Sequence, residues 1–124
     1  MEKKKALVVD DSPYIQKSLA KILEAHHCEV VGTASNGLEA VRLFNELRPD
    51  FVTLDLVMPQ MGGFQTLQLL KRLSPSVKVI MVSSLADKEK ILECVRLGAS
   101  HYIIKPFDED SVVETLRKVV FQEE

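Results

Sequence analysis

Polar side chains stand at the ends of several short apolar runs in this sequence. The run 51–54, with its β-branched centre, ends abruptly in Asp55, and three other runs end in acids, serines or a lysine. If each run is a strand of one parallel sheet, these side chains share its carboxyl edge, where open α/β sheets carry their sites. Each residue alone reads equally well as a cap, turn or surface residue, but together they predict a functional site. The set consists of Asp10, Asp11, Asp55, Ser83, Ser84 and Lys105.

The three acids in this set limit the chemistry that the site could perform. Carboxylates held close together repel one another, and burial without a partner raises the pKa of a carboxyl group. Lys105 would offset one negative charge, and a divalent cation would offset the other two. Hard oxygen ligands suit Mg²⁺, whereas a zinc site would need a cluster of His or Cys that the sequence lacks.

A carboxylate beside a cation and an ammonium group can attack a phosphoryl group. Asp55 would be the nucleophile, and the metal and Lys105 would stabilise charge on the equatorial oxygens, giving an aspartyl phosphate. A serine hydroxyl at the end of the fourth run could donate a hydrogen bond to that product. The sequence has no Gly-rich P-loop, and Gly62-Gly63 lacks the fingerprint spacing, so bound nucleotide is not expected.

Helix-like segments alternate with the apolar runs along the whole chain. Strands are predicted at 6–9, 29–34, 51–55, 77–82 and 102–104. Helix starts are predicted at Ser12-Pro13, Asn36 with Glu39, the glycine pair, about Asp87, and Asp108. In the fourth helix Ile91, Leu92 and Val95 should face inward. Five βα units predict one doubly wound α/β domain with a parallel sheet of order 2-1-3-4-5.

The composition fits an ordinary globular domain. The chain has 124 residues, of which 46% are hydrophobic and 27% charged, and its net charge is −2. This balance gives no reason to expect nucleic-acid binding, and no run is long enough to insert into a membrane or act as a signal peptide. A cytoplasmic location is expected. Cys28 and Cys94 form no CxxC pair and are interpreted as reduced structural thiols, and His26-His27 as surface or helix-end residues.

With these motifs in place, the sequence resembles the receiver domain of two-component response regulators, a family with a flavodoxin-like fold. The similarity covers nearly the whole chain. It rests on residues 8–12, 55–59 with Gly62-Gly63, 81–84, and 98–107. The chemotaxis member of this family is a known example of the strand order 2-1-3-4-5, so that order is not independent support.

The resemblance implies a phosphorylation site built on the acids. Asp55 would be the phosphoacceptor, with a sensor histidine kinase or a phosphotransfer protein as donor and Mg²⁺ as cofactor. Asp11 would bind the metal directly and Asp10 mostly through water. Asp55 itself and the backbone carbonyl of Val57 would complete the protein ligands.

The resemblance also implies a switch on the last two strands. Lys105 would pair with a phosphoryl oxygen, and the Lys105–Pro106 peptide bond would be cis. Ser83 would be the switch hydroxyl, and Ser84 would offer its backbone N–H to the phosphoryl group. Tyr102 would be the switch aromatic that turns inward when Ser83 moves toward the phosphate. Signalling to a protein partner would use the face of helix 4, strand 5 and helix 5, presenting Lys88, Lys90, Ile91, His101, Tyr102 and Pro106.

Three functions remain open at this point. The first is a stand-alone, chemotaxis-like switch, which is no enzyme beyond its own phosphorylation and dephosphorylation. The second is a receiver domain, residues 1–124, taken from a longer regulator with a DNA-binding or enzymatic output. The third is an aspartyl-phosphate phosphohydrolase, but such enzymes typically carry an acid two residues after the nucleophile, where this chain has Val57. Because Val57 and Leu85 are both apolar, we hypothesise that they hinder an attacking water and prolong the phosphorylated state.

Overall fold

A computed structural model describes residues 2–122 of the chain. Its strands are β1 (Lys4–Val9), β2 (Cys28–Ala34), β3 (Phe51–Leu54), β4 (Lys78–Ser84) and β5 (His101–Lys105). Its helices are α1 (Pro13–Ala25), α2 (Gly37–Leu47), α3 (Gly63–Leu73), α4 (Lys88–Arg96) and α5 (Glu109–Thr115). A 3₁₀ turn, η1 (Leu85–Asp87), precedes α4, and a π-helical turn, η2 (Leu116–Val120), continues α5.

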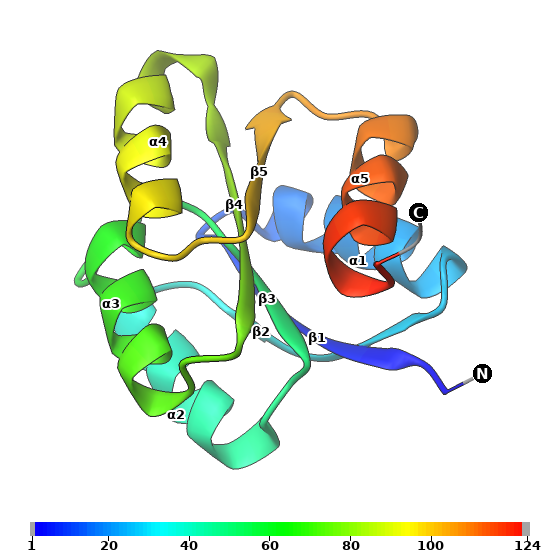
Figure 1. Cartoon of the computed structure of the whole chain (residues 1–124), viewed down its shortest axis with the longest axis horizontal. Helices are drawn as coiled ribbons and strands as arrows, with labels where there is room; N and C mark the ends of the chain where they lie inside the picture. Colours follow the sequence, from blue (N-terminus) through cyan, green and yellow to red (C-terminus); the bar gives the residue numbers. More distant parts are fainter. Residues whose placement is uncertain (1, 123–124) are drawn as a thin grey trace.

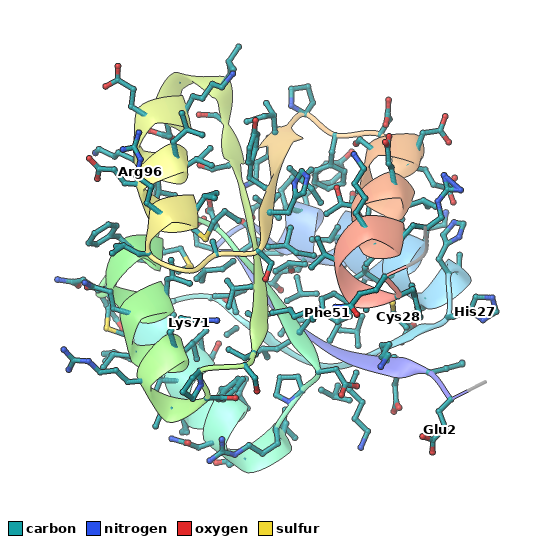
Figure 2. The ribbon with its side chains drawn as sticks, in the orientation of Figure 1. Glu2, His27, Cys28, Phe51, Lys71 and Arg96 are labelled. Atoms are coloured by element: carbon teal, nitrogen blue, oxygen red, sulfur yellow. The ribbon has the colours of Figure 1, made fainter. Side chains whose placement is uncertain are left out.

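All five strands are parallel and lie in one sheet of order β2-β1-β3-β4-β5, which confirms the predicted doubly wound fold. Helices α2, α3 and α4 cover one face of the sheet, and α1 and α5 cover the other (Figure 1). Each face therefore has its own hydrophobic core. Phe44, Leu67 and Ile91 belong to the first core, whereas Cys28 and Phe51 lie in the second, between the sheet and the α1/α5 pair (Figure 2).

The predicted capping residues lie at the N-terminal ends of α1, α2 and α5. The Ser12 hydroxyl accepts from the backbone N–H of Ile15 at the start of α1, and the Asp108 carboxylate accepts from the N–H of Ser111 at the start of α5. Asn36 caps α2, but Glu39 reaches the N–H of Ser35 rather than that of Asn36, so the capping box is shifted by one residue. Such caps satisfy backbone donors that the first turn leaves free.

The strand register brings the acids together. Val9 of β1 pairs with Leu54 of β3, so the residue after each strand is an aspartate. The ladder continues one step beyond the strands, because the N–H of Asp55 donates to the carbonyl of Val9 at 2.9 Å. On the side of β3 opposite β1, strand β4 ends at Ser84, two residues later than predicted. Pairing with β5 extends it there, and such pairing cannot be read from the apolar pattern of β4 alone.

Some side-chain predictions for α4 are wrong. Ile91 is fully buried, as predicted for an inward residue, so it cannot also belong to an exposed signalling face. Leu92 was predicted to face inward but is 37% exposed. Both cysteines are buried free thiols, as expected. Within residues 2–122, every helix is too short or too polar to cross a bilayer.

Candidate functional site

The three aspartates that follow β1 and β3 form one cluster. Asp10, Asp11 and Asp55 each offer a carboxylate oxygen, and these oxygens all lie within 4.8 Å of one another. Asp10 and Asp55 are buried, with 2% and 5% of their surface exposed, whereas Asp11 is exposed. The predicted meeting of the acids at the carboxyl edge of the sheet is therefore confirmed.

Lys105, the last residue of β5, reaches across the sheet edge to this cluster. Its ammonium nitrogen lies 2.7 Å from Oδ2 of Asp10 and 3.5 Å from Oδ1 of Asp55. The Lys105–Pro106 peptide bond is cis, as the resemblance implied. Lys105 thus pairs most closely with Asp10 and leaves much of the negative charge on the other two acids without a partner.

The pKa of Asp55 is shifted upward by its surroundings, chiefly by burial. Burial raises the pKa of the Asp55 carboxyl from 3.8 to about 6, and the neighbouring charge of Asp10 adds to this rise. The Lys105 ammonium and the backbone N–H of Val57 act in the opposite direction but do not cancel it. A carboxylate in this position gains from any further cation placed beside it.

Asp10 and Asp11 differ in how their oxygens are used. Oδ1 of Asp10 accepts from the N–H of Ser12 at 3.0 Å, and its Oδ2 accepts from Lys105. The amide of Gln16, a residue that the sequence analysis did not single out, donates to the backbone carbonyl of Asp10 at 2.6 Å. Within residues 2–122 the Asp11 carboxylate accepts no hydrogen bond, so it has the freer oxygens for a ligand.

The donor set of the cluster fits a hard divalent cation. Three carboxylates with oxygens a few ångströms apart provide the oxygen ligands that Mg²⁺ prefers. Two negative charges remain after the charge of Lys105 is counted, and a divalent ion would balance them. The pKa of Asp55 is raised mainly by burial and further by the charge of Asp10, so its ionised form is disfavoured in the protein alone and would be stabilised by a bound cation.

The loop after Asp55 packs tightly beneath the cluster. The N–H of Gly63 donates to the carbonyl of Leu56 at 2.8 Å, and a Cβ added at Gly63 would collide with the carbonyl oxygen of Asp55. Glycine is needed here because two stretches of backbone approach each other closely. The loop places Val57 at the rim of the site, 61% exposed, and Leu85 at the end of β4 is 62% exposed.

The serines at the end of β4 have a partner that the sequence analysis missed. Ser83 is buried, and its hydroxyl lies 3.3 Å from Oδ2 of Asp87, while the Ser84 hydroxyl lies 3.1 Å from the same oxygen. From the sequence, Asp87 is predicted only as a helix start. An acid three and four residues after two serines was the available signal, since a tight turn brings such residues together.

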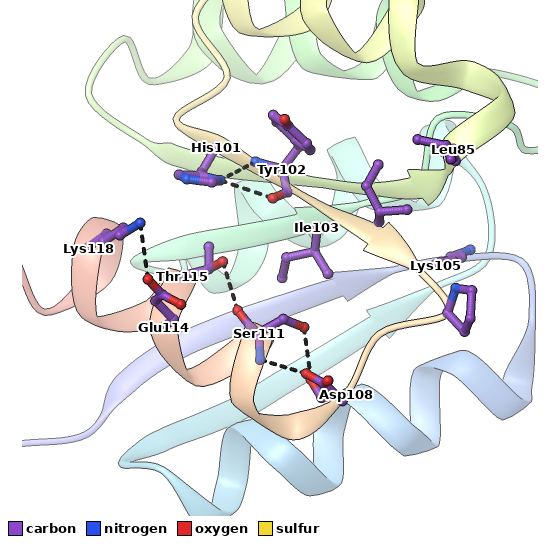
Figure 3. A pocket seen from close by; sticks show the side chains of 12 residues that line it. Leu85, His101, Tyr102, Ile103, Lys105, Asp108, Ser111, Glu114, Thr115 and Lys118 are labelled. Atoms are coloured by element: carbon purple, nitrogen blue, oxygen red, sulfur yellow. Dashed lines mark hydrogen bonds and ion pairs between the residues drawn. The ribbon is translucent and has the colours of Figure 1, made fainter.

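Tyr102 on β5 packs against the first hydrophobic core and also faces a surface groove. Its ring is half-buried and lines a groove of about 590 Å³ that runs between β5 and α5 and reaches Leu85 (Figure 3). His101 stands beside it, with ring centroids 5.6 Å apart, and the Nδ1 of His101 accepts from the N–H of Tyr102. Tyr102 therefore shares this groove with Lys105, which reaches the acidic cluster, and with the exposed Leu85.

Helices α1 and α5 are connected by a side-chain contact at the C-terminal end of α1. His26 closes α1 and lies 2.8 Å from the carboxylate of Glu109, the first residue of α5. His26 is half-buried and His27 is exposed, which matches their interpretation as helix-end and surface residues. Neither histidine belongs to the acidic cluster.

The fold and the cluster agree with the family that the chain matches. Residues 6–117 match the response regulator receiver domain, and the chain belongs to this family. The general function of such domains is that of a phosphorylation-dependent switch in two-component signalling.

Several relatives of the chain are chemotaxis proteins. The chain is 38% identical to the chemotaxis protein CheY of Thermotoga maritima over 116 residues, which cover 94% of this chain and 97% of the relative. It is 40% identical to CheY of Listeria monocytogenes over 114 residues, covering 92% and 96%. Among solved structures, the CheX–CheY–BeF3–Mg complex of Borrelia burgdorferi matches with a TM-score of 0.91 and 32% identity, covering 97% of this chain and 90% of the other. The chain is therefore a chemotaxis-like receiver domain.

Proposed function

We propose that this receiver domain works by accepting a phosphoryl group on Asp55 from a phosphohistidine donor, with Mg²⁺ bound to the acidic cluster. One observation carries this proposal: Asp55 is a buried carboxylate that shares its surroundings with two further acids and one lysine. The donor would be a sensor histidine kinase or a phosphotransfer protein.

The residues of the site would divide the reaction between them. An oxygen of Asp55 attacks phosphorus, the P–N bond to the donor imidazole breaks, and the nitrogen of the imidazole leaves with the electron pair. Lys105, 3.5 Å from Oδ1 of Asp55, is placed to donate to a phosphoryl oxygen as charge develops there. The Ser83 hydroxyl and the backbone N–H of Ser84 would donate to the remaining oxygens.

Asp10, Asp11, Asp55 and the backbone carbonyl of Val57 would hold the cation. A bound divalent ion would shield the incoming phosphoryl oxygens from the carboxylates. Asp11 would be a direct ligand because its carboxylate is free of other partners within residues 2–122. Asp10 would act through water because both of its oxygens already accept hydrogen bonds.

The surface beside the site suits the docking of a phosphodonor protein. A groove of about 280 Å³ lies between α1 and the loop after β5, and its lining includes Pro106, which directly follows Lys105 in the chain. Tyr14 stands at its rim with 76% of its surface exposed. Ile15, Ile22 and Phe107 are half-buried, and an exposed aromatic ring beside such apolar residues is typical of protein interfaces. The groove is lined by Tyr14, Ile15, Ser18, Ile22, Pro106 and Phe107.

The signal would leave through the face of α4, β5 and α5. The groove in Figure 3 crosses this face and combines the Tyr102 ring with charged groups on α5 and η2, including the Lys118–Glu114 pair at 3.2 Å. Lys88, Lys90 and Pro106 are exposed beside it and His101 is half-buried. A change in Tyr102 would alter the surface that a protein partner meets, which couples the site to binding.

A phosphohydrolase is the weaker alternative. The position two residues after Asp55, where a second acid would assist a leaving group, holds the exposed and apolar Val57. We therefore expect one slow round of phosphorylation and decay rather than rapid turnover.

The test is incubation with acetyl phosphate and Mg²⁺, followed by intact-mass measurement. The wild type should gain one phosphoryl group, Asp55→Asn should gain none, and Asp110→Asn, which alters an exposed acid on α5, should behave as the wild type. An unmodified wild type, or equal modification of Asp55→Asn, would refute the proposal.

A further inference from the structure

Asp87 closes a tight turn at the end of β4 and accepts two hydrogen bonds there. Its Oδ2 lies 3.3 Å from the hydroxyl of Ser83 and 3.1 Å from that of Ser84. Hydrogen bonds to an ionised acceptor are stronger than neutral ones. One carboxylate oxygen thus holds both serine hydroxyls at the end of the strand that borders Asp55.

Asp87 accepts from the serine hydroxyls instead of capping the helix that it precedes. Asp87 is the N-cap residue of α4, where an aspartate normally accepts from the backbone N–H groups of the first helical turn. In residues 2–122 its side chain makes no such capping bond. The carboxylate is turned back toward the serines, so α4 begins without the cap that this residue type usually provides.

Ser83 has only one proton to give. A serine hydroxyl donates one hydrogen bond, and here the buried Ser83 directs it to Asp87. Under the proposed function, the same proton would be needed by a phosphoryl oxygen on Asp55. The two acceptors therefore compete for one donor. Ser83 would donate to Asp87 in the resting state and to a phosphoryl oxygen in the phosphorylated state.

We propose that Asp87 is a positioning residue that holds Ser83 in the resting arrangement and so limits how readily Asp55 is phosphorylated. This inference rests on the proposed function of Asp55. Occupation of the site and release of Ser83 from Asp87 are linked, because a ligand shifts an equilibrium only by its preference for one of the two states. Removal of the acceptor should make the phosphorylated arrangement easier to reach.

The test uses beryllofluoride with Mg²⁺ as a phosphoryl mimic, titrated into the full chain and followed by NMR. Asp87→Ala should bind about fivefold more tightly than the wild type, the effect of one hydrogen bond of ordinary strength. It should also be phosphorylated faster by acetyl phosphate. Asp87→Asn, which keeps an acceptor oxygen without the charge, should fall between the two.

Loss of a negative charge near the site could also favour an anion, so a matched control is needed. Glu89→Ala removes an exposed acid from the first turn of α4, two residues further on, and should bind as the wild type does. Thermal unfolding of each variant separates a folding defect from a change in binding. If Asp87→Ala does not fold, the comparison of Asp87→Asn with the wild type decides the question.

A double-mutant cycle with Ser83→Ala tests whether Asp87 acts through the hydroxyl. In the Ser83→Ala background, Asp87→Ala should no longer change the affinity for beryllofluoride. A gain that persists there, or no gain in the folded single variants, overturns the inference while leaving the proposed function intact. A wild type that binds no beryllofluoride and takes up no phosphoryl group overturns both.

Discussion

The two sides of the sheet edge that form the site differ in how their polar groups are satisfied. After β1 and β3, three carboxylates face a single lysine, and burial raises the pKa of Asp55 to about 6. After β4, both serine hydroxyls already have a partner in Asp87. On the acidic side the carboxylates outnumber the lysine, so a cation would be stabilised there. On the serine side the hydroxyls already donate to a carboxylate of the protein. Under the two proposals above, this difference means that the acidic side binds the ligands, whereas the serine side must exchange hydrogen-bond partners before it can contact them.

The largest expected effect follows from removing the lysine of the acidic side, Lys105. Lys105→Ala should slow phosphorylation by acetyl phosphate about 100-fold, as loss of one charged donor to a transition state usually does. Lys88→Ala, an exposed lysine on α4, is the matched control and should leave the rate unchanged. A rate for Lys105→Ala close to that of the wild type would show that the ammonium has no part in the reaction.

The loop beneath Asp55 offers a test of how rigidly the acidic side is built. Gly63→Ala should lower the free energy of unfolding by about 3 kcal/mol, because its Cβ meets backbone that cannot move aside. Gly62→Ala should cost less than about 1 kcal/mol, since there the nearest heavy atom is 3.2 Å away. Urea unfolding measures both changes. Equal effects of the two substitutions would contradict the close approach at Gly63.

The shifted pKa of Asp55 predicts a pH-dependent gain in stability when its charge is removed. Because folding raises this pKa from 3.8 to about 6, Asp55 stabilises the fold when protonated, and that contribution is lost as the pH rises through about 6. In metal-free buffer, Asp55→Asn should therefore raise the free energy of unfolding by about 2 kcal/mol at pH 8, and by progressively less below pH 6.

Asp10, Asp11 and Lys105 are the charged groups that face Asp55 in this experiment. They remain in place in both proteins, so the difference isolates one carboxyl. Asp110→Asn on the surface of α5 provides the control and should show no such pH profile. If the two proteins differed in free energy of unfolding by the same amount at every pH, the pKa of Asp55 would not be raised by folding.

The smallest expected effect concerns Val57, at the rim of the site. Val57 is apolar and largely exposed, so it offers an attacking water no hydrogen bond. Val57→Asn should speed loss of the phosphoryl group about fivefold, equivalent to roughly 1 kcal/mol in the barrier. The decay is followed by intact mass after the phosphodonor has been removed. Unchanged or slower decay would refute the role given to Val57.

Much of the fold could be predicted because the signals for it are local. Apolar runs that end in polar residues marked all five strands, and capping residues such as Ser12 and Asp108 marked the helix starts. The acids of the site were found for the same reason: Asp10-Asp11 and Asp55 come at the ends of two strands, and parallel strands align their ends. The order of the strands came from rules of handedness together with the resemblance.

What could not be predicted depends on contacts between distant residues or on the conformation of a turn. The extension of β4 to Ser84 depends on pairing with β5. The contact of His26 with Glu109 joins residues 83 positions apart and has no sequence signal. In α4, Ile91 and Leu92 are neighbours of equal hydrophobicity, and only packing decides that the first is buried and the second exposed. Asp87 was missed because its role depends on the turn that returns it to the serines.

The most direct test of the central claim is to locate the phosphoryl group. The protein is incubated with acetyl phosphate in Mg²⁺ or in EDTA, reduced with borohydride to trap an acyl phosphate, digested, and analysed by peptide mass spectrometry. We predict a single reduced residue at Asp55, formed in Mg²⁺ and lost in EDTA. A trapped residue elsewhere, or equal labelling with and without the metal, would contradict the account.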